Sequence, residues 1–302
     1  HTARRTGPGI GLARRDHGRV HAGRPPGSRE RSGVRPGAGC GEDRSVSAHR
    51  LPNIGTRLIG RYIRWHESLP STNDVALRLA EVGVPEGTVI VAEEQTAGRG
   101  RRGRAWASPR GGIWLSVILR PGLPVERVPL IALSAAAATA RAIREATGLP
   151  ARVKWPNDVL VDGKKIVGIL AEAGAGGEWV VVGIGINANI PLDALPQATG
   201  YPATSLQALG HPVDQDALIT LVLRELEDGY DLLRSGGFRA TLRRWREMAD
   251  TLGRQVRVEM PDAAIEGVAQ DVDETGALLV RLDGGSVRRV VAGDLHVREV
   301  GP

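Results

Sequence analysis

Lysine is confined to one short stretch of this chain. The sequence contains 37 arginines but only three lysines, Lys154, Lys164 and Lys165, all within the twelve residues KWPNDVLVDGKK. A sequence that otherwise uses arginine and keeps lysine here indicates a need for a compact, rotatable ammonium group rather than a planar guanidinium. The plainer interpretation is a turn that tolerates lysine. Gly168 follows Lys165 in an apolar run, where glycine lets a ligand approach a strand backbone, so we expect Lys165 to act on a ligand.

A second cationic stretch is QTAGRGRRGRAW at residues 95–106, with four arginines and three glycines in twelve positions. Such a stretch suits an anionic small molecule, nucleic acid or plain solvation, and by itself it selects none of them. A β-branched run at 87–95 leads into it, and a second apolar run at 112–121 leaves it. We therefore expect a loop between two strands.

Two further motifs carry groups that suit a nucleotide. Asn157 and Asp158 could direct an amide and a carboxylate at ribose, adenine or a phosphate-bound cation, although Pro-Asn-Asp is more often simply a turn. Trp106 could stack on a purine or pack in the core. No G-x-x-x-x-G-K-[ST] motif is present, so any ATP must be bound by another architecture.

Small polar residues and glycines provide the remaining candidates. Ser71 and Thr72 precede an apolar helical pattern, so helix capping is the main alternative to ligand contact. The two glycines of GIGIN, at 183–187, cost a strand stability, and the usual compensation is close approach of another backbone or a flat ligand. The helix and third glycine of a dinucleotide-binding fingerprint do not follow, which disfavours a Rossmann site.

Charge is distributed unevenly along the 302 residues. The first 50 residues hold 11 arginines against 4 acids, whereas the other 252 hold 29 basic and 30 acidic residues, so the net charge of +6 does not argue for a nucleic-acid-binding body. Residues 1–55 are rich in Arg, Gly and Pro, and we expect them to form a disordered tail. The single cysteine, Cys40, and the lack of a long apolar run predict a cytoplasmic protein without disulfides, thiolate-held zinc or a membrane span.

The rest of the chain alternates strand-like and helix-like patterns. We expect strands at 62–70, 87–95, 112–121 and 179–187, and a hairpin over Asp162-Gly163 within 151–174. Helices are expected after Ser71, at 129–147, at about 214–234 and at 238–251. From Arg254 onward, short alternating strands predict a small barrel.

Five motifs occur together in the order and spacing of one family: STN at 71–73, GRGRRGRAW at 98–106, KWPND at 154–158, KIVGIL at 165–170 and GIGIN at 183–187. In this combination the chain resembles the biotin-protein ligases over about residues 61–300. The resemblance implies an α/β (α+β) fold, in which a mixed sheet with helices, related to the class II aminoacyl-tRNA synthetases, precedes a small SH3-like β-barrel. It divides the chain into the tail, a catalytic domain at 56–252 and a C-terminal domain at 253–302.

The resemblance also implies an activity. The family joins the carboxylate of biotin to the α-phosphate of ATP and passes the biotinyl group from biotinyl-5′-AMP to a lysine of a carrier protein. Two anions must meet in such a site, and the expected catalytic cations are Lys165, Arg99 and Arg101. The expected biotin-binding residues are Ser71, Thr72, Asn73, Gln95, Gly98, Arg99, Arg101, Lys165, Gly168 and Gly183. The expected ATP-binding residues are Arg101, Arg102, Arg104, Trp106, Asn157, Asp158, Lys165 and Asn187, with Mg²⁺ held chiefly by the phosphates.

The expected partner is a biotin carboxyl carrier protein, and a homodimer is a compatible assembly. Relatives with an N-terminal helix-turn-helix also act as repressors, but the tail lacks a trihelical apolar pattern, so we expect no sequence-specific DNA binding. One rival function is a lipoate- or octanoate-protein ligase of the same superfamily, whose arginine-glycine motif differs. The other is an RNA-binding module that uses GRGRRGR, although this stretch lacks interleaved Phe or Tyr for base stacking.

Overall fold

A computed structural model describes residues 51, 54–195, 202–261 and 263–297. The expected tail at 1–55 falls almost entirely outside these residues. The described residues belong to one compact unit, Asp43–Pro302.

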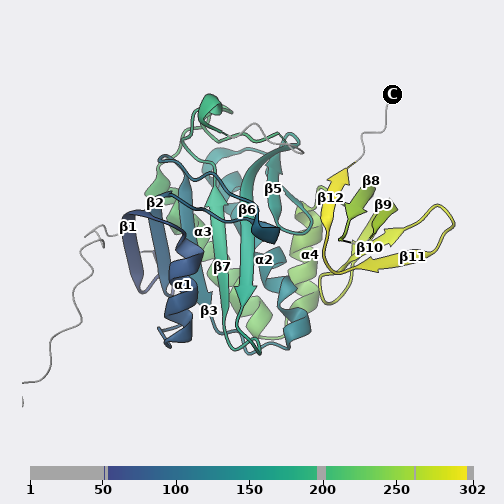
Figure 1. Cartoon of the computed structure of the whole chain (residues 1–302), viewed down its shortest axis with the longest axis horizontal. Helices are drawn as coiled ribbons and strands as arrows, with labels where there is room; N and C mark the ends of the chain where they lie inside the picture. The colour runs from purple at the N-terminus through teal and green to yellow at the C-terminus, as the bar shows by residue number, and fades with distance from the viewer. Residues whose placement is uncertain (1–50, 52–53, 196–201, 262, 298–302) are drawn as a thin grey trace, which may run out of the picture. The chain divides into compact units, whose positions relative to one another are not determined.

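The centre of this unit is a seven-stranded sheet (Figure 1). Its strands, in the order in which they lie side by side, are β1 (Ile63–Leu69), β2 (Val89–Gln95), β3 (Ile113–Leu119), β7 (Val180–Ile186), β6 (Lys164–Ala173), β5 (Asp158–Val161) and β4 (Arg152–Lys154). Only the pairing of β1 with β2 is parallel, and the other pairings are antiparallel. The sheet is therefore mixed, as expected.

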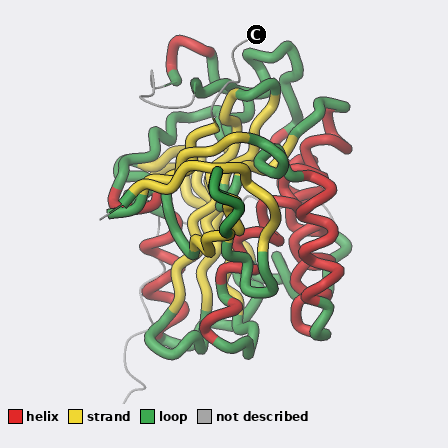
Figure 2. The backbone as a smooth tube through the Cα atoms, turned by 90° about the vertical axis from the view of Figure 1, so that its right-hand side faces the viewer, coloured by secondary structure: helices red, strands yellow, loops and turns green. Residues whose placement is uncertain are grey.

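Helices cover both faces of this sheet, as the side view shows (Figure 2). Strand β2 illustrates the division: Val89 and Val91 pack in the large core with the long helices, whereas Ile90 and Ala92 pack against the first helix. This alternation follows from the two-residue period of a strand. The helices are α1 (Thr72–Glu81), α2 (Pro129–Thr147), α3 (Gln215–Arg234) and α4 (Phe238–Met248). Single 3₁₀ turns lie at η1 (Arg101–Gly103), η2 (Val125–Arg127) and η3 (Leu192–Ala194).

The local sequence explains where helix α2 begins and ends. Proline stands at its first position, where the missing N–H costs nothing, and Gly148 ends it in the left-handed conformation with φ 73°. Six of its eight alanines are buried, because small side chains let α3 and α4 pack closely against it. The helix spans the predicted residues.

Helix α4 ends earlier than the pattern predicted. The expected end was residue 251, but Ala249 is already extended, and its backbone bridges in parallel to Val153 at the sheet edge. Asp250 continues this contact by donating its N–H to the Val153 carbonyl at 2.8 Å. A tertiary backbone pairing thus overrides the helical periodicity.

The C-terminal part forms a five-stranded antiparallel sheet in the order β11 (Val287–Val290), β10 (Leu278–Arg281), β9 (Ala264–Val272), β8 (Gln255–Glu259) and β12 (Asp294–Val297). It is fastened to the larger sheet by Trp155, whose indole N–H donates to the Gly276 carbonyl at 3.0 Å. Asp294 begins β12, and its carboxylate accepts a hydrogen bond from Arg102 of the arginine loop. The predicted fold class, a mixed α/β body with a small SH3-like C-terminal domain, is confirmed.

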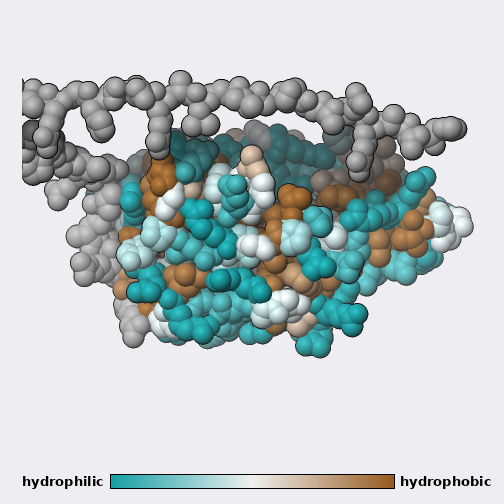
Figure 3. Space-filling model, turned by 90° about the horizontal axis from the view of Figure 1, so that it is seen from below, coloured by the Kyte–Doolittle hydropathy of each residue, from teal (hydrophilic) through white to brown (hydrophobic). Residues whose placement is uncertain are grey.

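The surface of the described chain is predominantly hydrophilic on the face in Figure 3, with separate apolar patches. Among the described residues, no helix is both long and apolar enough to span a membrane.

Candidate active site

A cavity of about 460 Å³ lies where α1, the arginine loop, the ends of β5–β7 and strand β12 meet. Most of the predicted site residues line it, although they come from separate segments of the sequence. These are Ser71, Thr72, Asn73, Gln95, Arg99, Arg101, Arg104, Trp106, Asn157, Asp158, Lys165, Gly168, Gly183 and Asn187. The convergence of motifs expected from the sequence is therefore present in the fold.

Gly98 and Arg102 do not line the cavity. A Cβ at Gly98 would lie within about 2.5 Å of the Ser108 hydroxyl. The Gly98 carbonyl accepts the Trp106 N–H at 2.9 Å, so this hydrogen bond joins the two ends of the loop. The Arg102 guanidinium points to Asp294, 3.0 Å away in the C-terminal domain. Direct ligand contacts by these two residues stay predictions.

One end of the cavity is lined by uncharged hydrogen-bonding groups. Ser71 caps α1, and Thr72 donates both its N–H, at 2.8 Å, and its hydroxyl, at 3.1 Å, to the Gln95 side-chain oxygen. The Gln95 amide nitrogen in turn donates to the Ser108 hydroxyl at 2.8 Å. Both interpretations of Ser71 are thus compatible, because it caps the helix and still faces the cavity.

Asn73 links this end to the sheet and is almost fully buried. Its amide nitrogen donates to Glu172 on β6 at 2.8 Å, and its oxygen accepts the Ser116 hydroxyl at 2.6 Å. A Cβ at Gly183 would overlap the Asn73 oxygen. Gly183 therefore makes room for Asn73 and also lines the cavity, and its contact with biotin stays a prediction.

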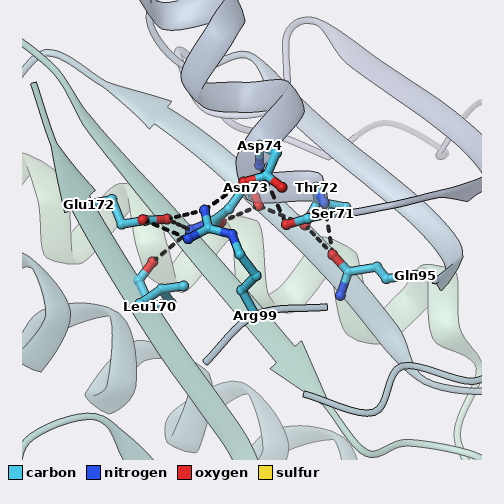
Figure 4. Close-up of polar contacts among 9 residues, drawn as sticks. Ser71, Thr72, Asn73, Asp74, Gln95, Arg99, Leu170 and Glu172 are labelled. Carbon is cyan, nitrogen blue, oxygen red and sulfur yellow. Dashed lines mark hydrogen bonds and ion pairs between the residues drawn. The ribbon is translucent and has the colours of Figure 1, made fainter. Parts of the chain in front are cut away.

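Arg99 extends from the loop to two carboxylates, Glu172 on β6 and Asp74 on α1 (Figure 4). Its two terminal nitrogens lie 3.0 and 2.8 Å from the two oxygens of Glu172, and one of them also lies 2.7 Å from Asp74. The hydrogen bond with Glu172 raises the pKa of Arg99 above its ordinary value, although burial opposes the shift.

Two of the three lysines converge on Asp158 at the opposite end. Lys165 Nζ lies 2.7 Å from one carboxylate oxygen, and Lys154 Nζ lies 3.7 Å from the other. Lys154 is only 6% exposed, and burial lowers its pKa from 10.5 to about 8, while Asp158 opposes the shift. Lys164, the third lysine, is exposed.

The C-terminal domain completes this end. Arg101 donates to the Asn157 side-chain oxygen at 3.2 Å and to the Gly293 carbonyl at 3.4 Å, and burial lowers its pKa, although it remains charged. Arg104 lies 2.7 Å from Asp294. Burial alone would raise the pKa of Asp294, but the neighbouring arginines lower it below its usual range.

Trp106 lies over the glycines of the sheet. A Cβ at Gly168 would lie 3.0 Å from its ring, and one at Gly185 would lie 2.6 Å from its indole nitrogen. The Lys165 ammonium lies 4.9 Å from the ring centroid, within cation–π range. Gly185, which we had not assigned to the site, therefore forms the floor beneath Trp106.

The sequence assignment also omitted Lys154, Glu172, Asp294 and His296 from the site. Lys154 carried a usable signal, since it belongs to the lysine cluster and to KWPND. The other three carried none, because ordinary carboxylates and an isolated histidine in surface-like strands are indistinguishable from solvated residues until the fold is known.

The cavity residues also bear on whether the protein itself could hold a metal ion. Among the described residues, no group of three or more His, Cys, Asp or Glu side chains could hold a metal ion. The carboxylates Asp158 and Asp294 are already paired with lysine or arginine. A protein-held metal centre therefore does not fit these residues.

Comparison with known proteins places this site in a family. The model of the Biotin/lipoate A/B protein ligase family matches residues 65–189, and that of the Biotin protein ligase C terminal domain matches residues 251–297. The bifunctional ligase/repressor BirA of Bacillus subtilis is 37% identical over 249 residues, which cover 81% of this chain and 76% of that protein. The chain belongs to the biotin protein ligase family. A second member, the biotin–[acetyl-CoA-carboxylase] ligase of Mycobacterium tuberculosis, is 36% identical over 82% of this chain and 95% of its own length.

Solved structures of biotin protein ligases share the fold. The enzyme from Aquifex aeolicus in complex with biotin and ATP aligns with a TM-score of 0.69 at 29% identity, covering 79% of this chain and 99% of that one. The enzyme from Leishmania major in complex with biotinyl-5-AMP aligns with a TM-score of 0.54 at 27% identity, covering 77% and 99%.

Proposed function

We propose that this protein activates biotin with ATP as biotinyl-5′-AMP and transfers the biotinyl group to a lysine of a carrier protein. The observation that carries the proposal is the electrical polarity of the cavity. Beside the cavity, Arg99 is bound by two carboxylates, whereas four cations that line the cavity lie around Asp158 and Asp294: Arg101, Arg104, Lys154 and Lys165.

This polarity suits a ligand with a neutral polar head and a reactive anionic end. The ureido group of biotin is uncharged and requires hydrogen-bond partners, which Ser71, Thr72 and Gln95 offer at one end of the cavity. The carboxylate of biotin and the phosphates of ATP are anionic, and we place them at the cationic end, beside Lys165 and Arg101.

The first reaction step forms one bond and breaks another. A carboxylate oxygen of biotin attacks the α-phosphorus, a new O–P bond forms, and the bond from phosphorus to the bridging oxygen of the pyrophosphate breaks. Pyrophosphate leaves with the electron pair. Lys165 and Arg101 reduce the repulsion between the carboxylate and the phosphates and favour an in-line approach. Positioning and electrostatic stabilisation of this kind both lower the activation free energy of the transfer.

In the second step the carrier lysine attacks the carbonyl carbon of the adenylate. A C–N bond forms, the C–O bond to the phosphate breaks, AMP leaves with that oxygen, and the surplus proton of the nitrogen passes to solvent. Until then the mixed anhydride must be shielded from water. We propose that the loop from Gly98 to Trp106 covers it, since Arg99, Arg101, Arg104 and Trp106 of this loop line the cavity.

Magnesium would enter with the nucleotide. Mg²⁺ is usually bound through substrate phosphates with few protein ligands, and it would neutralise phosphate charge there. Among the described residues, no group of three or more His, Cys, Asp or Glu side chains could hold the ion without the phosphates.

The proposed carrier is the biotin carboxyl carrier protein of a carboxylase, and the proposed location is the cytoplasm. One cysteine in 302 residues fits a reducing compartment. The rival RNA-binding function is not supported, because Arg99, Arg102 and Arg104 are paired with carboxylates of this chain.

The test uses the purified full chain with ATP, Mg²⁺, biotin and a purified biotin carrier domain. We expect streptavidin to detect the carrier only when all components are present and its target lysine is intact. Replacement of biotin by lipoate distinguishes the rival ligase. AMP release that is driven by lipoate and not by biotin would overturn the proposal in favour of that rival.

A further inference from the structure

Arg99 lines the cavity, yet its terminal nitrogens are occupied by carboxylates of this chain. Glu172 on β6 receives a two-pronged contact from them, and Asp74 on α1 receives a third, at 2.7 Å (Figure 4). A guanidinium that is bound by two carboxylates has little attraction left for an anionic ligand. The geometry therefore distinguishes Arg99 from Arg101, whose guanidinium donates to the neutral oxygens of Asn157 and Gly293.

Glu172 is held in place independently of Arg99. Asn73 donates to it at 2.8 Å, and Asn73 is itself fixed by Ser116 on β3 and by its own burial. Three elements, α1, β3 and β6, thus orient the carboxylate before the arginine reaches it. A rigid carboxylate that accepts two hydrogen bonds fixes the orientation of the guanidinium and also stabilises its charge.

The position of Arg99 is transmitted to the whole loop. Arg99 pairs by a backbone bridge with Ala105, and the adjacent Gly98 carbonyl accepts the Trp106 N–H at 2.9 Å. Fixing Arg99 therefore fixes the returning strand of the loop. It keeps Trp106 over the sheet glycines and beside Lys165.

We propose that Glu172 and Asp74 make Arg99 a positioning residue, which anchors the cavity loop to β6 and α1 so that it retains the adenylate. The consequence for activity rests on the proposed function, whereas the anchor itself consists of contacts among residues of this chain. In this account Arg99 acts through Trp106 and Arg101 and does not touch the reacting atoms.

The first experiment compares Glu172→Gln with a matched control. Glu225→Gln breaks a similar two-pronged pair, with Arg141 at 2.7 and 3.1 Å, between α3 and α2. We expect Glu172→Gln to release free biotinyl-5′-AMP about tenfold faster than wild type, which corresponds to a loss of about 1.4 kcal/mol of anchoring. The rate of biotin-dependent pyrophosphate exchange should fall by less than about threefold, and the control should match wild type in both.

The second experiment exchanges the charges, which separates positioning from ligand contact. Arg99→Glu and Glu172→Arg each place like charges together and should release adenylate rapidly. The double variant restores an opposite-charge pair, and we expect it to recover retention to within about threefold of wild type. If the double variant stays as defective as Arg99→Glu, the cation is required at residue 99 itself and the proposal is wrong.

A third measurement requires no enzymatic activity. Trypsin cleavage after Arg101, Arg102 and Arg104 is followed by mass spectrometry in the ligand-free protein, and we expect it to be several-fold faster in Glu172→Gln than in Glu225→Gln. Equal cleavage rates would overturn the anchor whether or not the protein biotinylates a carrier. Faster cleavage in a protein that makes no adenylate would instead refute the proposed function and leave the anchor standing.

Discussion

Removing the Lys165 ammonium should abolish most adenylate formation without unfolding the protein. The structure explains why the fold should survive. Asp158, the partner of Lys165 at 2.7 Å, also lies 3.7 Å from Lys154, so Lys165→Ala leaves the carboxylate paired with one remaining cation. The main effect of Lys165→Ala is therefore the loss of a positive charge beside the reacting anions.

The size of the effect follows from Coulomb's law. Two unit charges about 4 Å apart, at an effective dielectric constant of about 20, interact by about 4 kcal/mol. Each 1.4 kcal/mol or so changes a rate about tenfold, which gives an upper limit near a thousandfold. Lys165 is 24% exposed, so solvent and salt screen part of this interaction. We therefore expect the rate of biotin-dependent pyrophosphate exchange to fall by about 100- to 1,000-fold.

Lys164 provides the control, because it is the adjacent residue of β6 but is exposed to solvent. Exchange of labelled pyrophosphate into ATP is measured with saturating biotin, and thermal unfolding is measured on the same samples. Lys164→Ala should retain the wild-type rate. A Lys165→Ala rate within about fivefold of wild type, with an unchanged melting temperature, would refute the assignment of this ammonium to the reacting anions.

Three further changes test other parts of the site. Arg101→Gly removes the contacts with Asn157 and the C-terminal domain, so free biotinyl-5′-AMP should accumulate and label lysines nonspecifically, as mass spectrometry would detect. Gly185→Ala would place a Cβ 2.6 Å from the Trp106 indole nitrogen and should raise the KM for ATP severalfold; an unchanged KM would mean that Trp106 has no part in nucleotide binding. Burial lowers the pKa of Lys154 from 10.5 to about 8, so from about pH 8 to 10.5 the unfolded chain binds a proton that the folded chain lacks, and the free energy of unfolding gains a positive slope with pH. Lys154→Met should remove that contribution in urea unfolding, and an identical pH dependence in both proteins would contradict it.

Much of the fold could be predicted because local physics agreed with the tertiary structure. Helix α2 carries proline at its start, alanines at its buried positions and glycine after its end, so pattern and packing select the same residues. The hairpin over Asp162 and Gly163 follows from a turn with two positive φ angles of 48° and 71°. The lysine cluster indicated the cationic end for a chemical reason that required no fold.

The unpredicted features depend on contacts between distant segments. Glu172 meets Arg99 across 73 residues of sequence, and Asp294 meets Arg102 across 192. Nothing in the local sequence of either carboxylate distinguishes it from a solvated surface acid. The contact between Gly183 and Asn73 was unpredictable for the same reason, because Asn73 lies 110 residues earlier in the sequence.

The central claim is that biotin's carboxylate attacks the α-phosphorus of ATP within this cavity. Biotin labelled with ¹⁸O in its carboxylate tests it most directly, by mass spectrometry of the nucleotide product after transfer to a carrier. Attack at the α-phosphorus leaves one carboxylate oxygen on the phosphate, so AMP should carry one ¹⁸O. Unlabelled AMP, or ADP with labelled phosphate, would contradict the account.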